Sequence, residues 1–220
     1  MSENTTASDA APEEIEAESG AEAANPPGRK RPKPGERRLQ ILQTLAGMLE
    51  TPGAERVTTA ALAAKIGVSE AALYRHFASK AQMFEALLEF IEQSCFGLMN
   101  QIRDSALEPG QQAFRMILML LQFAEKNPGM ARVMVGDALV LEHQRLNQRM
   151  NHFFDKVEML LKDVLFKQAE AQNSATPSVQ AQVRASLLTA YAMGQIQRFA
   201  RSGFKRKPTE RAAEALAQIL

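Results

Sequence analysis

A chain of 220 residues, 45% of them hydrophobic, is long enough to bury a sizeable core and is expected to be globular for most of its length. Its single cysteine excludes an internal disulfide, no signal peptide opens the chain, and no apolar run approaches the roughly 20 residues that span a bilayer, so secretion and membrane insertion are not expected. The net charge of +1 hides an asymmetry, because residues 1–28 carry seven acidic residues and no Lys or Arg, whereas residues 29–80 carry ten Lys or Arg against four acidic residues. The expected compartment is a reducing cytoplasm.

Helix-forming residues dominate the chain, and alternating β-branched runs are scarce, which predicts an all-α fold. Residues 1–35 are the exception, since they lack apolar periodicity and contain four prolines in the run NPPGRKRPKPGERR. We expect these residues to form a disordered arm. Its basic end is either part of a solvated tether or an arm that seeks DNA phosphates.

The first helix is predicted over residues 36–50. Its apolar residues recur at helical spacing, and the expected buried face is Leu39, Leu42, Ala46 and Leu49. The run TPG that follows stops this helix.

Two shorter helices are predicted next. Residues 60–66 form the first of them, after a cap at Thr58 or Thr59, and Gly67 supplies the left-handed conformation that ends it. Ser69 then caps a helix over residues 70–77. Two short helices joined by a tight turn that contains glycine have the sequence form of a helix-turn-helix, so residues 36–80 are expected to form a DNA-binding domain.

The second of these short helices is expected to be anchored from beneath by Val68, Leu73 and Phe77. Its other side is then available to the major groove of B-DNA, where base edges can be read. The candidate DNA-binding residues are Thr58, Thr59, Ser69, Glu70, Ala71, Ala72, Tyr74, Arg75, His76 and Lys80.

These residue types suit different parts of a duplex. Ala71 and Ala72 suit contact with a thymine methyl group, whereas Tyr74 and Lys80, together with Thr59, suit phosphates. Taken singly, Tyr74 could be a half-buried core aromatic and Arg75 an ordinary solvent-facing charge. Their joint occurrence in a basic segment favours DNA binding.

Residues 81–220 are expected to form a larger helical domain for dimerisation and partner binding. Its fourth helix, residues 80–106, should bury a stripe that includes Met83, Leu87, Phe90, Ile91 and Leu98. Breakers at Pro109 and at Asn127-Pro128-Gly129 delimit the fifth helix, and a second apolar stripe on the long helices suits a four-helix dimer interface. The further helices are predicted over residues 111–126, 138–168, 179–201 and 211–220.

A groove between the fourth and fifth helices could accept a partner peptide. Phe90 and Met119 would give apolar contacts, and Lys126 and Asn127 would bind acidic and main-chain groups. The alternative is that Phe90 and Met119 belong to the core and that Lys126 is a favourable charge at a helix C-terminus.

The sequence carries no enzyme signature, no metal site and no cofactor motif. Cys95 has no histidine partner in a motif, and His143 and His152 lie in one predicted helix with no third ligand in view. The basic run FKRKP at residues 204–208 is better explained as a solvated loop than as a second nucleic-acid contact.

The segment TTAALAAKIGVSEAALYRHFASK resembles the TetR-type regulators, although Ala78 stands where many members have proline. This resemblance implies an all-helical homodimer, with a three-helix DNA-binding domain and a larger helical domain, that reads a palindrome-like duplex site and has no membrane partner.

The chain is also similar to a narrower group, the nucleoid-occlusion factors. This similarity lies within residues 36–210, in the runs SEAALYRHFASKAQMFEALLEFIEQS, FAEKNPGMARVMVGDALVLEHQRLNQRMNHFFDKVE and QRFARSGFKRKPTE. This similarity implies that the DNA-bound dimer, alone or in higher-order assemblies, antagonises the division protein FtsZ. The FtsZ tail would bind at the groove named above, and the protein would act in the cytoplasm at the nucleoid. The alternative is a ligand-responsive TetR-type repressor, which a cavity lined by Met and Phe would favour.

Overall fold

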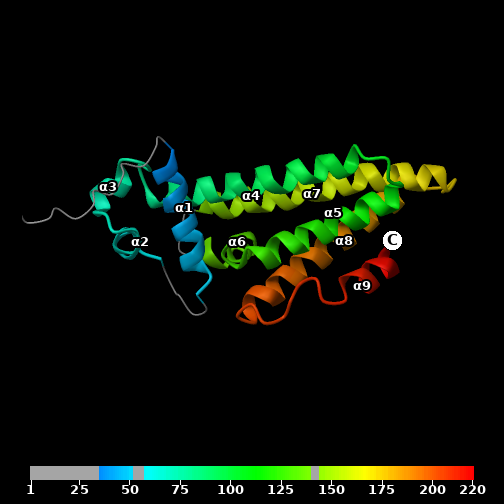
Figure 1. Cartoon of the computed structure of the whole chain (residues 1–220). Helices are drawn as coiled ribbons and strands as arrows, with labels where there is room; N and C mark the ends of the chain where they lie inside the picture. The colour runs from blue at the N-terminus through cyan, green and yellow to red at the C-terminus, as the bar shows by residue number, and fades with distance from the viewer. Residues whose placement is uncertain (1–34, 52–56, 140–143) are drawn as a thin grey trace, which may run out of the picture. The chain divides into compact units, whose positions relative to one another are not determined.

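The computed structural model describes residues 35–51, 57–139 and 144–220 (Figure 1). Every regular element in these ranges is helical, which confirms the all-α prediction. The predicted arm, except Gly35, lies outside the described residues. The helices are α1 (Glu36–Leu49), α2 (Thr59–Ile66), α3 (Glu70–Tyr74), α4 (Lys80–Arg103), α5 (Pro109–Lys126), α6 (Pro128–Met134), the 3₁₀ helix η1 (Asp137–Leu139), α7 (Gln144–Ala171), α8 (Pro177–Arg201) and α9 (Ala212–Ile219).

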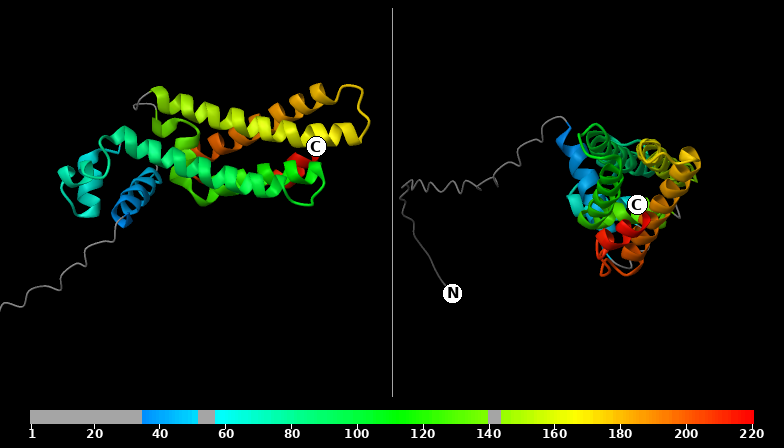
Figure 2. Two further views of the ribbon diagram at one scale, coloured as in Figure 1. Left: turned by 90° about the horizontal axis from the view of Figure 1, so that it is seen from above. Right: turned by 90° about the vertical axis from the view of Figure 1, so that its right-hand side faces the viewer.

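The bundle that carries most of the core consists of α4, α5, α7 and α8. α7 and α8 pack along each other, α5 contacts both, and α4 lies against α5 and α7. In the right-hand view of Figure 2, α7 and α8 lie next to each other and α9, in red, lies beside α8. The buried apolar cluster continues from this bundle into α1–α3, so the domain boundary near residue 80 stays a prediction.

The buried face of α1 differs from the expected one. Ile41, Leu45 and Leu49 are buried, whereas Leu39 is exposed. The buried residues are spaced four positions apart along the helix. Two of the predicted residues, Leu42 and Ala46, each lie one position after a buried residue. Leu42 and Ala46 still pack against the core from its edge.

The buried stripe of α4 is also narrower than predicted. Met83, Leu87 and Ile91 are fully buried, but Phe90 and Leu98 are 46% and 44% exposed, so their assignment to the core was wrong. The helix ends at Arg103 rather than at Ala106. Gln112 of α5 stabilises the turn, because its Nε2 donates to the carbonyl oxygens of Arg103 and Ser105, each at 3.0 Å.

α4 and α7 are joined by ion pairs as well as by apolar contacts. The guanidinium of Arg149 donates to both carboxylate oxygens of Glu92, at 2.9 and 2.7 Å, and Arg145 pairs with Glu85 at 2.5 Å. The hydrogen bond from Arg149 lowers the pKa of Glu92. α7 begins at Gln144 within the described residues, later than the predicted residue 138, because Asp137–Leu139 forms η1 and residues 140–143 lie outside the described ranges.

The short helix α6 was not predicted, since Asn127-Pro128-Gly129 was interpreted only as a breaker. Proline at the first position of a helix is favourable, and Pro128 occupies that position here. α6 crosses α1 at close range, because a Cβ atom on Gly129 would lie 2.1 Å from the carbonyl oxygen of Ala46. Arg132 adds a hydrogen bond to the carbonyl oxygen of Leu49 at 3.3 Å.

Within the described part of the chain, none of the helices combines the length and the hydropathy that a bilayer crossing requires.

Candidate nucleic-acid interface

The turn between α2 and α3 is held by local caps, as the sequence predicts. The hydroxyl of Thr58 accepts a hydrogen bond from the Ala61 amide at 3.1 Å, and Ser69 accepts one from the Ala72 amide at 3.3 Å. Gly67 adopts the left-handed conformation, with φ 75° and ψ 42°, in which glycine carries no steric penalty. The buried side of α2 consists of Leu62, Ala63 and Ile66.

α3 is shorter than predicted, because it ends at Tyr74 rather than at Phe77. The amides of His76 and Phe77 both donate to the carbonyl oxygen of Leu73, at 2.9 and 3.1 Å, and so form a tight turn. Leu73 and Phe77 are buried as expected, and Val68 is half-buried against the core.

Arg38 of α1 holds this turn, and sequence reasoning missed it. Its Nη1 donates to the carbonyl oxygen of His76 at 2.9 Å, and its guanidinium lies 4.1 Å from the centre of the Phe77 ring. The two contacts lie 38 and 39 positions away along the chain, so no local pattern could have indicated them.

Most of the predicted DNA-binding residues lie on the exposed side of α2 and α3. Tyr74 is 45% exposed, so its interpretation as a half-buried core aromatic was wrong. The exposed members are Thr58, Ser69, Glu70, Ala71, Tyr74, Arg75 and His76, and the half-buried members are Thr59, Ala72 and Lys80.

Three of these residues form one hydrogen-bonded network between α2 and α3. The hydroxyl of Thr59 donates to Oε2 of Glu70 at 2.6 Å, and the hydroxyl of Tyr74 donates to Oγ1 of Thr59 at 3.5 Å. The ammonium of Lys80, at the start of α4, lies 5.6 Å from the centre of the Phe84 ring. The network holds the Tyr74 side chain on the exposed surface of α2 and α3.

The four candidate partner-binding residues lie on the neighbouring helices α4 and α5 and at the end of α5. Phe90 projects from the core, as described above, whereas Met119 is half-buried and packs against it. Lys126 is exposed in the last turn of α5. The side-chain amide of Asn127 donates to the carbonyl oxygen of Phe123 at 2.8 Å, so Asn127 helps to end the helix.

α8 carries an apolar face that its own core does not use. Val179, Val183 and Leu187 recur every four residues and are each more than half exposed, as is Met159 on the neighbouring α7. A second apolar stripe on the long helices was expected from the sequence as a dimer interface, and that use of the exposed face stays a prediction.

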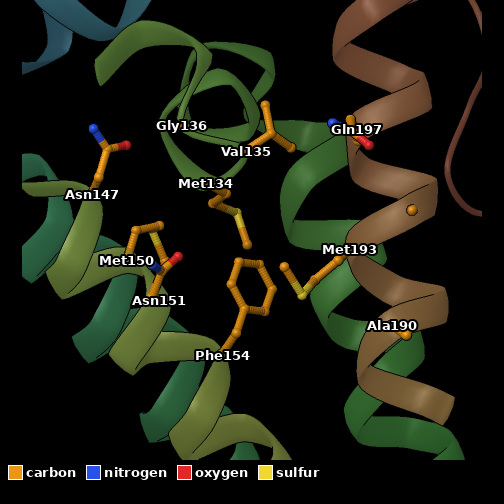
Figure 3. A pocket seen from close by; sticks show the side chains of 11 residues that line it. Met134, Val135, Gly136, Asn147, Met150, Asn151, Phe154, Ala190, Met193 and Gln197 are labelled. Carbon is orange, nitrogen blue, oxygen red and sulfur yellow. The ribbon is translucent and has the colours of Figure 1, made fainter. Parts of the chain in front are cut away.

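A recess of about 420 Å³ opens beside this face, between α6, α7 and α8 (Figure 3). Phe154 and Met193 point toward each other across it, and Met134 and Met150 also line it. A lining of Met and Phe side chains is the one expected for the cavity of a ligand-responsive repressor. The recess opens at the surface, because Asn151, Ala190, Met193 and Gln197 on its walls are exposed.

The residues that were considered for enzyme or metal chemistry are Cys95, His143 and His152. Burial raises the pKa of the Cys95 thiol to about 12, so the thiol keeps its proton at neutral pH. His143 lies outside the described residues, and the exposed His152 lies 3.4 Å from Asp155. Among the described residues, no group of three or more His, Cys, Asp or Glu side chains could hold a metal ion.

Two protein families match the chain. Residues 41–87 match the bacterial regulatory proteins of the tetR family, and residues 112–219 match the SlmA-like type of tetracyclin repressor-like C-terminal domain. The nucleoid occlusion factor SlmA of Idiomarina loihiensis is 49% identical over 174 residues, which cover 79% of this chain and 88% of that protein. SlmA of Alteromonas mediterranea is 48% identical over 181 residues, covering 82% and 92%.

Solved structures of TetR-like regulators share the fold. The ketosteroid transcriptional regulator KstR2 of Mycobacterium tuberculosis superimposes with a TM-score of 0.66 at 20% identity and covers 84% of this chain and 93% of its own. A transcriptional regulator from Rhodococcus sp. Rha1 gives a TM-score of 0.66 at 23% identity and covers 83% and 93%.

Proposed function

Because the chain belongs to the SlmA family of nucleoid occlusion factors, within the TetR-type bacterial regulatory proteins, we propose that it binds specific DNA sites as a dimer and inhibits FtsZ ring assembly over the chromosome. It is a regulator and not an enzyme. The observation that supports the proposal most is the near-50% identity, because it extends through the helical bundle, where TetR-type proteins differ from one another, as well as through the helix-turn-helix. The protein then works in the cytoplasm, on the nucleoid.

The exposed side of α3 is proposed to enter the major groove. Ala71 and Ala72 offer small apolar surfaces to thymine methyl groups, and the Tyr74 ring offers a flat face and a hydroxyl. Thr59 and Lys80 flank this surface and are proposed to meet phosphates on either side of the groove, with the Thr59 hydroxyl releasing Glu70 to donate to a phosphate. Arg38 holds the end of α3 from behind, and is a positioning residue in this arrangement.

Lys80→Ala is expected to weaken binding to every duplex, specific or not, because the ammonium contributes to phosphate binding and reads no base. The slope of log K against log salt concentration should become shallower by about one. Fluorescence anisotropy titrations over a series of salt concentrations measure this slope. Lys167→Ala, which removes an exposed charge from α7, should leave the slope unchanged. An unchanged slope in Lys80→Ala would contradict the phosphate role of this residue.

A second copy of the chain is proposed to cover the apolar face of α7 and α8. The stripe of Val179, Val183 and Leu187 repeats at helical spacing, as the seam of a four-helix interface does. The recess beside it continues the same face, so side chains of the partner subunit would fill it. This arrangement explains its Met and Phe lining without a ligand, which makes the ligand-responsive repressor the weaker alternative.

FtsZ capture is proposed to use the surface between α4 and α5. The exposed ring of Phe90 gives an apolar anchor, and the ammonium of Lys126 gives a charge for acidic groups of an extended FtsZ tail. Asn127 fixes the end of α5 beside that charge.

FtsZ sedimentation in the presence of GTP tests the proposed function. Adding the protein together with a specific duplex should reduce the amount of pelleted FtsZ, and adding the protein alone should reduce it less. Lys126→Glu should remove most of this effect and leave duplex affinity unchanged, because the reversed charge repels an acidic tail. Lys167→Glu is the matched control and should behave as the wild type does. If pelleted FtsZ does not change with protein and duplex, the division-control proposal is wrong.

A further inference from the structure

A second recess, of about 400 Å³, lies between the C-terminal half of α8, residues 202–211 and the start of α9. Four cationic side chains line it, against the single carboxylate of Glu210; they are Arg198, Arg206, Lys207 and Arg211. Figure 1 shows α9, in red, well away from α2 and α3, so this recess is separate from the helix-turn-helix surface. No function assigned above uses it.

Three of the four cations have no carboxylate partner among the described residues. The guanidinium groups of Arg198, Arg206 and Arg211 make no ion pair there. Lys207 alone is paired, at 3.5 Å, with Glu125 of α5. Like charges that converge on a concave surface repel one another and focus a positive potential in the hollow, which an anion would relieve.

The segment that carries these cations is held in place by its own contacts. The hydroxyl of Ser202 accepts hydrogen bonds from the amides of Lys205 and Arg206, at 3.1 and 2.9 Å. The hydroxyl of Thr209 donates to Glu125, and the rings of Phe199 and Phe204 pack with their centres 5.2 Å apart. The backbone of this segment is therefore in place before any ligand arrives, which lowers the entropic cost of binding.

We propose that this recess binds an oligophosphate, a compact anion of two or three linked phosphoryl groups. Guanidinium groups match phosphate oxygens in geometry and keep their charge at any physiological pH. Three of them, with a lysine beside them, are more than one phosphoryl group can contact. The Tyr191 hydroxyl on the wall can donate to the same anion, since burial raises its pKa and it stays protonated.

Calorimetric titration of the full-length protein with inorganic triphosphate tests the proposal. The titration should saturate at one triphosphate per chain, and orthophosphate should bind more weakly. Arg206→Gln combined with Arg211→Gln should weaken triphosphate binding by about tenfold or more, because each guanidinium supplies charge-assisted hydrogen bonds. Arg115→Gln, which removes an exposed charge of α5 outside the recess, is the matched control and should bind as the wild type does.

Several results would overturn the proposal. The first is that the wild-type protein does not bind triphosphate, and the second is that the double variant binds it with unchanged affinity. The third is that Lys80→Ala loses as much affinity for triphosphate as the double variant does. A double variant that lowers only the salt slope of duplex binding would assign the surface to DNA instead. Arg206 and Arg211 are exposed, so the double variant should unfold at the wild-type temperature without anion. If it does not fold, Arg211→Gln alone replaces it in the titration.

Discussion

Gly129→Ala is expected to destabilise the protein by about 1 to 3 kcal/mol, although alanine is the better helix former. The added Cβ would lie 2.1 Å from the carbonyl oxygen and 3.0 Å from the carbonyl carbon of Ala46, and neither backbone atom can move without displacing α1. Urea unfolding followed by circular dichroism measures the change, as a lower midpoint at an unchanged slope.

Gly47→Ala is the matched control for this substitution. Gly47 also lies in α1, but a Cβ atom there meets nothing within 4 Å. Its replacement should therefore leave the free energy of unfolding unchanged or raise it by up to about 1 kcal/mol. If Gly129→Ala proved as stable as Gly47→Ala, the helices α1 and α6 would cross less closely than described above.

Leu187→Glu is expected to convert the proposed dimer to monomers and to lower affinity for a palindromic duplex by about 100-fold or more. A carboxylate in the middle of an apolar interface would be buried without a partner. Its desolvation would cost more free energy than the contacts of the neighbouring residues contribute to dimerisation. Once one subunit of a dimer has bound its half-site, the other subunit is held at a high effective concentration near the second half-site, which a monomer lacks. Sedimentation equilibrium gives the oligomeric state, and anisotropy titration gives the affinity.

Two controls separate dimer loss from unfolding in this experiment. Affinity for a duplex with a single half-site should stay the same in Leu187→Glu. Gln111→Glu, which adds the same charge to the exposed side of α5, should remain a dimer. A dimeric Leu187→Glu protein with wild-type affinity would exclude this face as the interface.

The parts of the fold that were predicted from the sequence are those fixed by neighbouring residues. Caps at Thr58 and Ser69, and the left-handed Gly67, act within one helical turn, so their signals are local. The errors arose where the burial of a residue depended on helices distant in the sequence. Phe90 and Leu98 belong to the apolar side of α4 by spacing, and only the positions of α5 and α7 decide which part of that side is covered.

The candidate DNA surface also has some features that are fixed by neighbouring residues and others that depend on distant ones. Its exposed residues could be predicted because Leu73 and Phe77 had to face the core. The contacts that orient it could not, since Thr59 and Glu70 are 11 positions apart and Arg38 and His76 are 38 apart. Hydrogen bonds over such separations leave no periodic trace in a sequence.

The ion pairs between α4 and α7 would restrict the DNA sites that the proposed dimer can bind. α4 begins directly after the helix-turn-helix, and its pairs with Arg145 and Arg149 fasten it to the helix that carries part of the apolar face. In the proposed dimer, each helix-turn-helix would thereby be a rigid extension of the apolar interface between the two subunits. The two helix-turn-helix surfaces of such a dimer would lie at a constant separation, so we expect the spacing of the two operator half-sites along the duplex to matter as strictly as their base sequence.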